Sequence, residues 1–201
     1  MFTMFDDETT HEDYFMVECM LGNVASVDLC IQLLKIDVTN KLILCVGEWN
    51  CTNCVDIVDR LLREPTVGPS AVAFRLACRN KRVDVVDRLL QDGRTDPSDY
   101  NNVEIRWASM DGYVAVVDRL LQDSRTDPST ENNDAICWAS KNGHTDVVDL
   151  LMNHQINRVN PAVFENYPFR VARQLGHTAV MNRLLQDDRV LKYVIKKELV
   201  C

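Results

Sequence analysis

Short apolar runs with helical spacing recur along the whole chain. In residues 145–152 the apolar side chains stand at positions i, i+1, i+4 and i+5, which predicts one buried face of a helix; they are Val147, Val148, Leu151 and Met152. Residues 114–121 show the same spacing 31 residues earlier. The rows formed by these side chains are therefore expected to stack into a continuous core.

A second short helix is predicted over residues 132–142, before each such apolar face. Gly143 separates the two helices and can adopt the positive φ that ends the first one, as Gly112 and Gly176 can in the neighbouring units. Thr145 and Asp146 then stand where a side chain can cap or charge-stabilise the start of the second helix. The pattern therefore predicts a helix-turn-helix unit.

These units belong to an internal repeat. Residues 85–98 (VVDRLLQDGRTDPS) return almost unchanged as residues 116–129 (VVDRLLQDSRTDPS). The polar residue of the Val-Asp-x-x-Leu core recurs six times, at Asp28, Asp59, Asp87, Asp118, Asp149 and Asn182. Repeats of this length form solenoids, in which each unit buries its apolar face on its neighbours. We predict an all-α solenoid of about six helix-turn-helix units.

Each unit is expected to carry a short projecting finger, because Asp-Pro-Ser turns the chain and the proline cannot continue a helix. One finger should be short, since three residues are missing between Pro69 and Ala77 relative to the next unit. We expect residues 13–192 to form a single repeat domain, with divergent units at 13–62 and clearer ones at 63–185. Residues 1–12 are expected to be a loose acidic segment and residues 193–201 a C-terminal tail, with atypical capping repeats beside them.

The unit resembles the ankyrin repeat. The pattern Ala-x-x-x-Gly-His-x-x-Val-Val-x-x-Leu-Leu of that family is similar to residues 139–152, although the Thr-Pro-Leu-His of its first helix is degenerate, the nearest match being residues 167–170 (YPFR). The unit length and the Asp-Pro-Ser fingers also resemble arrays of amoebae and their giant DNA viruses. The resemblance implies a non-catalytic module that binds a partner protein on the concave face of an ankyrin solenoid. It also implies that His144 and His177 bond to neighbouring backbone.

Composition and charge limit the classes of partner and the cellular locations that we expect. The chain is 46% hydrophobic and 26% charged, which is typical of a folded protein. Its start is acidic, and no apolar run approaches the ~20 residues that span a bilayer, so we expect an intracellular, cytoplasmic protein, in the host cytoplasm if it is viral. A net charge of −8 disfavours nucleic acid as a partner.

The two ends of the chain differ in charge. Residues 1–54 carry 9 acidic and 2 basic side chains, whereas residues 155–201 carry 4 acidic and 8 basic ones. An alternative function is therefore a structural component that associates with itself through these ends. The charges also fit terminal repeats that are simply solvated.

Cysteine and histidine chemistry is sparse. Eight cysteines without a regular framework are expected to be reduced thiols. Cys51 and Cys54 form a Cys-x-x-Cys pair, which can be structural, half of a zinc site or a redox site. No phosphate-binding loop, serine nucleophile motif or carboxylate pair in a cleft is evident, so we predict no catalytic residues, no cofactor and no metal.

The candidate partner-binding residues form a ladder and a set of finger tips. Leu76, Trp107, Trp138 and Val171 occupy one position of the first helix in successive units, where indoles can anchor a partner or pack under the fingers. Met110 and Lys141 lie one turn further along, and the finger tips vary between units. The predicted set is Asp99, Tyr100, Trp107, Met110, Thr130, Glu131, Trp138 and Lys141.

Overall fold

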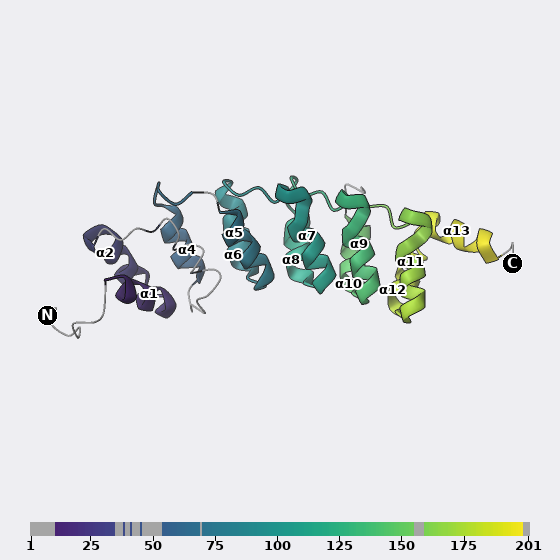
Figure 1. Cartoon of the computed structure of the whole chain (residues 1–201), viewed down its shortest axis with the longest axis horizontal. Helices are drawn as coiled ribbons and strands as arrows, with labels where there is room; N and C mark the ends of the chain where they lie inside the picture. The colour runs from purple at the N-terminus through teal and green to yellow at the C-terminus, as the bar shows by residue number, and fades with distance from the viewer. Residues whose placement is uncertain are drawn as a thin grey trace. The chain divides into compact units, whose positions relative to one another are not determined.

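The fold is all-α throughout the part of the chain that the structure describes. A computed structural model describes residues 11–34, 38, 41, 45, 54–68, 70–154 and 159–198, and within them every regular element is a helix. The helices are labelled in Figure 1. The chain divides into two compact units, residues 1–95 and 96–201, and each is described by itself.

The first unit contains five described helices. They are α1 (His11–Leu21), α2 (Val24–Leu34), α4 (Cys54–Leu62), α5 (Ala71–Arg79) and α6 (Val83–Asp92). Helix α1 packs against α2, α4 packs against both α2 and α6, and α5 packs against α6. α1 begins at His11, inside the segment that the sequence predicts to be loose; residues 1–10 lie outside the described part.

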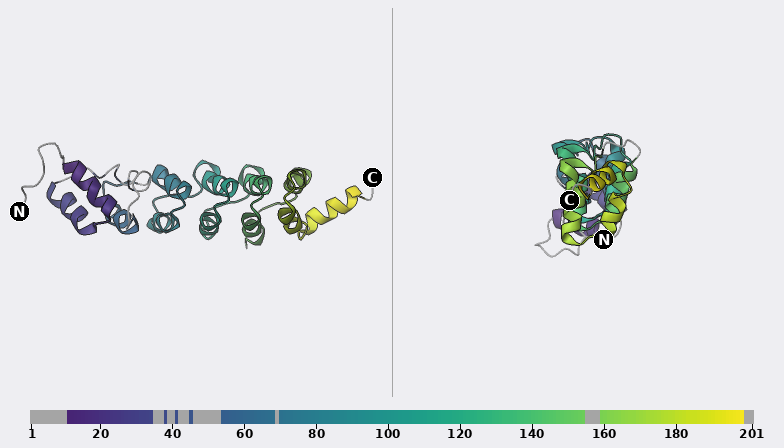
Figure 2. Two further views of the ribbon diagram at one scale, coloured as in Figure 1. Left: turned by 90° about the horizontal axis from the view of Figure 1, so that it is seen from below. Right: turned by 90° about the vertical axis from the view of Figure 1, so that its right-hand side faces the viewer.

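The second unit holds three helix pairs and a last helix. The first helices are α7 (Asp99–Asp111), α9 (Thr130–Asn142) and α11 (Val163–Leu175); the second helices are α8 (Val114–Leu121), α10 (Thr145–Asn153) and α12 (Thr178–Leu184). First helices pack on first helices and second helices on second helices, so the unit has two layers (Figure 2). Helix α13 (Asp188–Glu198) packs against α11 and extends past residue 192, where the sequence places the end of the repeat domain.

The predicted apolar rows form the core of the second unit. Val116, Val117 and Leu120 are at most 1% exposed, and so are Val147, Val148 and Leu151 of the next second helix. Met152 is half-buried. The helical spacing read from the sequence therefore places the core correctly.

Glycine ends each first helix of this unit, as predicted. Gly143 follows α9 with φ of +78°, a left-handed conformation that favours glycine, and Gly112 and Gly176 have φ of +73° and +77°. The ring of His177 packs on Gly143, and its Nε2 lies 3.0 Å from the carbonyl oxygen of Lys141 in the preceding unit. His144 makes the equivalent bond, so the bond that the family resemblance implies is present at both histidines.

The expectation that Thr145 caps the second helix is wrong. Helix α10 begins at Thr145 itself, and His144 stands at the N-cap position without a side-chain cap bond. The reason is that the glycine turn already positions this end: the backbone N–H of Thr145 donates to the carbonyl of Gly143 at 3.0 Å. Asp146 lies in the first helical turn, where its charge is favourable.

The repeated Asp-Arg pair of the second helices links successive helix-turn-helix repeats. Arg60 pairs with Asp28 of the preceding second helix at 2.6 Å, and Arg88 pairs with Asp59 at 2.6 Å. In the second unit Arg183 pairs with Asp149 in the same way. We call these contacts the Asp-Arg ladder.

A second recurring contact fixes the base of three fingers. In three fingers an aspartate accepts bonds from the guanidinium of the arginine two residues later, which we call the Asp-x-Arg clamp: Asp92 with Arg94, Asp123 with Arg125, and Asp187 with Arg189. The arginine hydrogen bond holds the pKa of each of these carboxyls below its usual value. In the first finger the Arg94 guanidinium also donates to the carbonyls of Leu62 and Val67, which ties the finger to the unit before it.

The fingers enter the first helices through an unusual left-handed turn. Three consecutive residues have φ between +48° and +65° in each of α7, α9 and α11; they are Tyr100–Asn102, Glu131–Asn133 and Phe164–Asn166. Left-handed backbone costs an L residue roughly 1–2 kcal/mol, although asparagine tolerates it. Asparagine is the third residue of every turn.

Two of these third asparagines bond to the next finger and the last one bonds to α13, which holds the turns in place. The amide oxygen of Asn102 accepts from the backbone N–H of Asp127 at 2.7 Å, and that of Asn133 accepts from Asn160 at 2.6 Å. Asn166 instead donates to the carbonyl of Val190 at 3.2 Å. We call this row the asparagine clamp.

The predicted short finger lacks the left-handed turn. Helix α5 begins at Ala71 after an ordinary N-cap, in which the Ser70 hydroxyl accepts from the N–H of Ala73 at 3.1 Å. The three residues missing from the sequence thus correspond in number to the left-handed turn of the longer fingers.

Candidate interaction surface

The left-handed turns present their first residues to solvent. Tyr100 is 71% exposed and Phe164, its counterpart two units later, is 59% exposed. The exposed carboxylate of Glu131 accepts from the Asn101 amide at 2.7 Å and lies 3.9 Å from the Arg106 guanidinium. Aromatic groups and one internally bonded carboxylate therefore occupy the edge of the first-helix layer.

The other two predicted finger-tip residues differ in exposure. Asp99 is exposed, whereas Thr130 is half-buried and its hydroxyl donates to the backbone carbonyl of Asp127 at 3.1 Å. Thr130 thus helps to close its own finger. Asp99 remains available at the surface.

The tryptophan ladder is neither fully buried nor fully exposed. Trp107 is 37% exposed, Trp138 is half-buried, and Val171 at the same position is 8% exposed. The ammonium of Lys141 lies 4.6 Å from the centre of the Trp138 ring, which is a cation–π contact. Met110 is half-buried beside them. Both indoles thus keep part of their surface open to solvent.

We call the surface formed by these side chains the first-helix face. It consists of Tyr100, Trp107, Met110, Trp138, Lys141 and Phe164. A cavity of about 280 Å³ lies within it between α9 and α11, with Trp138, Phe164 and Tyr167 as its aromatic lining and Asp134, Cys137 and Lys141 around them. Phe164 and Tyr167, which follow Trp138 by 26 and 29 residues in the sequence, therefore meet it in one hollow.

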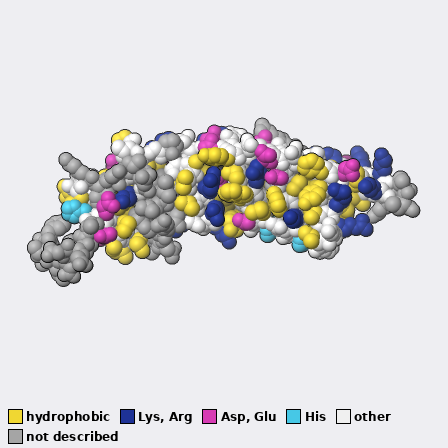
Figure 3. All heavy atoms as spheres, in the orientation of Figure 1, with side chains coloured by type: hydrophobic (Ala, Val, Ile, Leu, Met, Phe, Trp, Pro, Cys, Tyr) yellow, Lys and Arg dark blue, Asp and Glu magenta, His cyan; other side chains and the backbone are white. Residues whose placement is uncertain are grey.

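Hydrophobic and basic side chains alternate over the second unit. On the side visible in Figure 3, hydrophobic patches lie between lysine and arginine side chains, and basic side chains predominate around α13. The exposed lysines there are Lys192, Lys196 and Lys197. This surface thus has an aromatic part and a cationic part.

The repeat geometry agrees with the comparison to known families. A family model described as ankyrin repeats (three copies) matches residues 105–196. Residues 105–196 are ankyrin repeats. No curated protein is significantly similar to the chain. Ankyrin repeats are generally protein–protein interaction modules, and the family is typically non-enzymatic.

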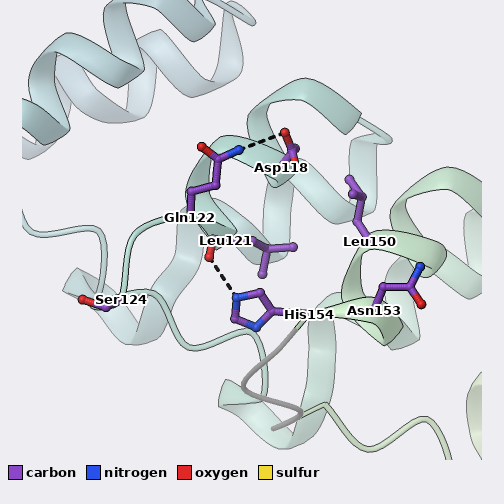
Figure 4. A pocket seen from close by; sticks show the side chains of 7 residues that line it. All are labelled: Asp118, Leu121, Gln122, Ser124, Leu150, Asn153 and His154. Carbon is purple, nitrogen blue, oxygen red and sulfur yellow. Dashed lines mark hydrogen bonds between the residues drawn. The ribbon is translucent and has the colours of Figure 1, made fainter.

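Another cavity of these ankyrin repeats lies between two second helices. It measures about 470 Å³ and opens between α8 and α10, at the point where Leu150 replaces the arginine of the Asp-Arg ladder (Figure 4). The carboxylate of Asp118 accepts from Gln122 of its own repeat at 3.1 Å, as Asp28 accepts from Gln32, but it lacks the arginine of the next repeat that Asp28 has in Arg60. A break in the repeated pair thus coincides with a hollow.

Serine, histidine and aspartate all line this cavity, but they do not form a catalytic triad. The Nε2 of His154 lies 2.9 Å from the carbonyl oxygen of Leu121. Asp118 is bonded to Gln122, and the hydroxyl of Ser124 points away from the histidine ring (Figure 4). A nucleophile, its base and an orienting carboxylate must be hydrogen-bonded in series, and these three are not.

Most cysteines among the described residues are buried free thiols. Cys19, Cys30, Cys45, Cys78 and Cys137 are free and buried. Burial raises the pKa of Cys45 and Cys137 to about 12, so neither is a thiolate at neutral pH. Cys54 is disulfide-bonded, so the expectation of a reduced thiol is wrong at this position, and Cys51 lies outside the described residues.

Two structural features are absent from the described residues. No group of three or more histidine, cysteine, aspartate or glutamate side chains with the geometry of a metal site occurs among them. None of their helices combines the length and the apolar character that crossing a bilayer requires.

The sequence does not single out Phe164 or Tyr167. Phe164 is in register with Tyr100 and Glu131, but its unit is two residues longer than the 31-residue period, which shifts it out of a simple alignment. The available signal is Asn166: counting back two residues from the asparagine of each finger gives Tyr100, Glu131 and Phe164.

Proposed function

We propose that the chain is a non-catalytic interaction module that holds a partner protein on the first-helix face of its ankyrin repeats. The observation that carries the proposal is the partial exposure of Trp107 and Trp138 beside the exposed Tyr100 and Phe164. Partly buried aromatic side chains on a rigid helical layer are typical anchors of protein interfaces, because they bury a large area with little loss of freedom.

Alanine at both tryptophans tests the proposal. Truncation of an interface anchor costs about 2 kcal/mol or more, so the W107A/W138A variant should bind its partner at least about thirtyfold more weakly. The measurement is affinity capture from the cells that make the protein, followed by mass spectrometry, with circular dichroism to verify the fold.

A matched control uses the second-helix layer. Val114 on α8 is 38% exposed, close to the exposure of Trp107, and the V114A variant should retain the captured protein. The proposal is wrong if W107A/W138A keeps its helical spectrum and captures the same protein in the same amount as the wild type.

Self-association is a second candidate function, favoured by apolar side chains on terminal helices. Leu29 and Leu33 of α2 are 54% and 69% exposed, and Ile195 of α13 is 47% exposed. The opposite charges of the two ends of the sequence would add attraction between the ends of different copies. Sedimentation at low and high salt separates the two candidates, because screening weakens such contacts; a strictly monomeric chain at low salt would rule self-association out.

A further inference from the structure

A cationic cavity lies beside the first-helix face, between α11 and α13. It measures about 390 Å³. The rings of Phe169 and Tyr193 contribute apolar lining, and Arg170, Arg173 and Lys197 supply three positive charges. The cavity therefore combines aromatic surface with cationic groups.

These positive charges are not neutralised by ion pairs with other described residues. Among the described residues, no ion pair is made by Arg170, Arg173 or Lys197, whereas Arg183 and Arg189 in the same repeat are paired with aspartates. Arg170 and Arg173 are exposed, and Arg170 makes only a 3.5 Å bond to a backbone carbonyl.

Lys197 of this cavity interacts with a tyrosine, which in turn is hydrogen-bonded to a carboxylate. The ammonium of Lys197 lies 5.2 Å from the centre of the Tyr193 ring, and the hydrogen bond with Tyr193 raises the pKa of Lys197. The Tyr193 hydroxyl in turn donates to the Glu165 carboxylate at 3.4 Å. Lys197 is thus fully protonated at neutral pH and available to an anionic group.

The cavity lies next to the aromatic one described above, and α11 forms a wall of both. Tyr167 of α11 lines the cavity beside Trp138, and Phe169 and Arg170 line the cavity beside α13. A peptide lying across α11 would therefore meet an aromatic hollow on one side of this helix and three cations on the other.

We propose that α11 and the two cavities beside it bind an acidic segment of a partner protein, with one bulky apolar side chain in the α9–α11 cavity and carboxylates at the α11–α13 cavity. This inference rests on the proposed function and adds the chemistry of the partner. Charge complementarity selects carboxylates, because isolated cations at an interface favour opposite charges and reject like ones. A nucleic acid fits less well, since Asp134 and Glu165 on the same surface would repel a continuous phosphate backbone.

Selection from random dodecapeptides displayed on phage tests the proposal without knowledge of the natural partner. Peptides retained by the wild-type chain should be enriched in aspartate and glutamate around a bulky apolar residue. A synthetic copy of the strongest peptide, labelled for fluorescence anisotropy, should bind the R170E/R173E variant at least about tenfold more weakly.

The matched control is K192E/K196E, which changes the net charge by the same amount on exposed α13 residues that do not line the cavity. It should weaken binding by about threefold or less, because exposed charges at a distance are screened by salt. The milder R170Q/R173Q variant repeats the test if the charge reversal disturbs the circular dichroism spectrum.

Four results would overturn the proposal. They are retained peptides without acidic enrichment, equal weakening by the two charge-reversed variants, tighter binding of a single-stranded DNA dodecamer than of the peptide, and self-association abolished by R170E/R173E, which would make a second copy the occupant. Partner capture that depends on Trp107 and Trp138 can persist under each of these results. Failure of this inference is therefore distinguishable from failure of the proposed function.

Discussion

The asparagine clamp should contribute measurably to stability, and Asn133 is the best position to test it. Its amide oxygen accepts from the backbone N–H of Asn160 at 2.6 Å, and its φ is +65°. Alanine loses the acceptor, which leaves a half-buried N–H unpaired at a cost of about 1–3 kcal/mol. Alanine also tolerates left-handed backbone less well, by roughly 1 kcal/mol. We expect N133A to lower the free energy of unfolding by about 2–4 kcal/mol.

Two further substitutions at Asn133 separate the two contributions. N133G removes the acceptor but relaxes the backbone, so it should cost less than N133A. N133D keeps both an oxygen acceptor and tolerance of left-handed backbone, so it should cost less than about 1 kcal/mol at neutral pH. The expected order of stability is wild type, Asp, Gly, Ala.

Urea unfolding followed by circular dichroism measures the effect. For a slope of about 2 kcal/mol per molar urea, the N133A midpoint should fall by about 1–2 M. Unfolding of stacked repeats need not be two-state, so midpoints are compared and the slopes are checked for change. The reasoning fails if N133A lies within about 0.5 kcal/mol of the wild type, or if N133D is as unstable as N133A.

Three other predictions follow from the repeat contacts. A methyl group at Gly143 would lie 2.7 Å from Nδ1 of His177, whereas one at Gly176 meets nothing within 4 Å at nearly the same φ. Thermal unfolding should therefore show that G143A is less stable than G176A by about 1–3 kcal/mol, and equal stabilities would contradict the packing of His177 on Gly143. L150R should fill the cavity between α8 and α10 and pair with Asp118, raising the free energy of unfolding by up to about 1 kcal/mol, and a gain that persists in the D118N background would argue against pairing. The Asp-x-Arg clamps lower carboxyl pKa values in the folded state, so their stabilisation should be complete above about pH 5 and lost as the pH falls below about 4; urea midpoints that stay constant down to pH 3 would contradict it.

Much of the fold could be predicted because it depends on short-range patterns. The apolar faces follow from helical spacing, and the ends of the first helices follow from glycines such as Gly143, whose φ of +78° disfavours other residues. The expected cap at Thr145 is wrong because local propensity cannot show that the glycine turn and the His144 backbone already position that helix end.

The left-handed turns could not be predicted from propensity. Their first residues are Tyr100, Glu131 and Phe164, none of which favours positive φ. The turns are held by bonds to the next finger, such as that from Asn160 to Asn133, and single-residue propensity contains no information about that partner. A periodic asparagine is a usable signal only after the contact is known.

The candidate site, like the fold, could be predicted only in part from the sequence. The sequence places Trp107 and Trp138 on one face because the repeat fixes their register, but their exposure depends on side chains from the neighbouring units. The cavity beside Trp138 exists because Phe164 and Tyr167 of the following unit meet it. Its lining residues lie in a unit of unequal length, where alignment by period fails.

Residues that recur in the repeats and residues that break the repeat pattern have different structural roles in this chain. The Asp-Arg ladder and the asparagine clamp join one repeat to the next, and Arg94 of an Asp-x-Arg clamp also bonds to the preceding repeat. The near identity of the repeated peptides therefore reflects packing between repeats. Where the repetition is broken, the surface changes: Leu150 in place of an arginine coincides with a cavity, and Phe164 in place of a glutamate adds an aromatic wall to another. A partner that distinguishes this array from a uniform one must contact residues at such interruptions, because the side chains of the repeated contacts are already bonded within the protein.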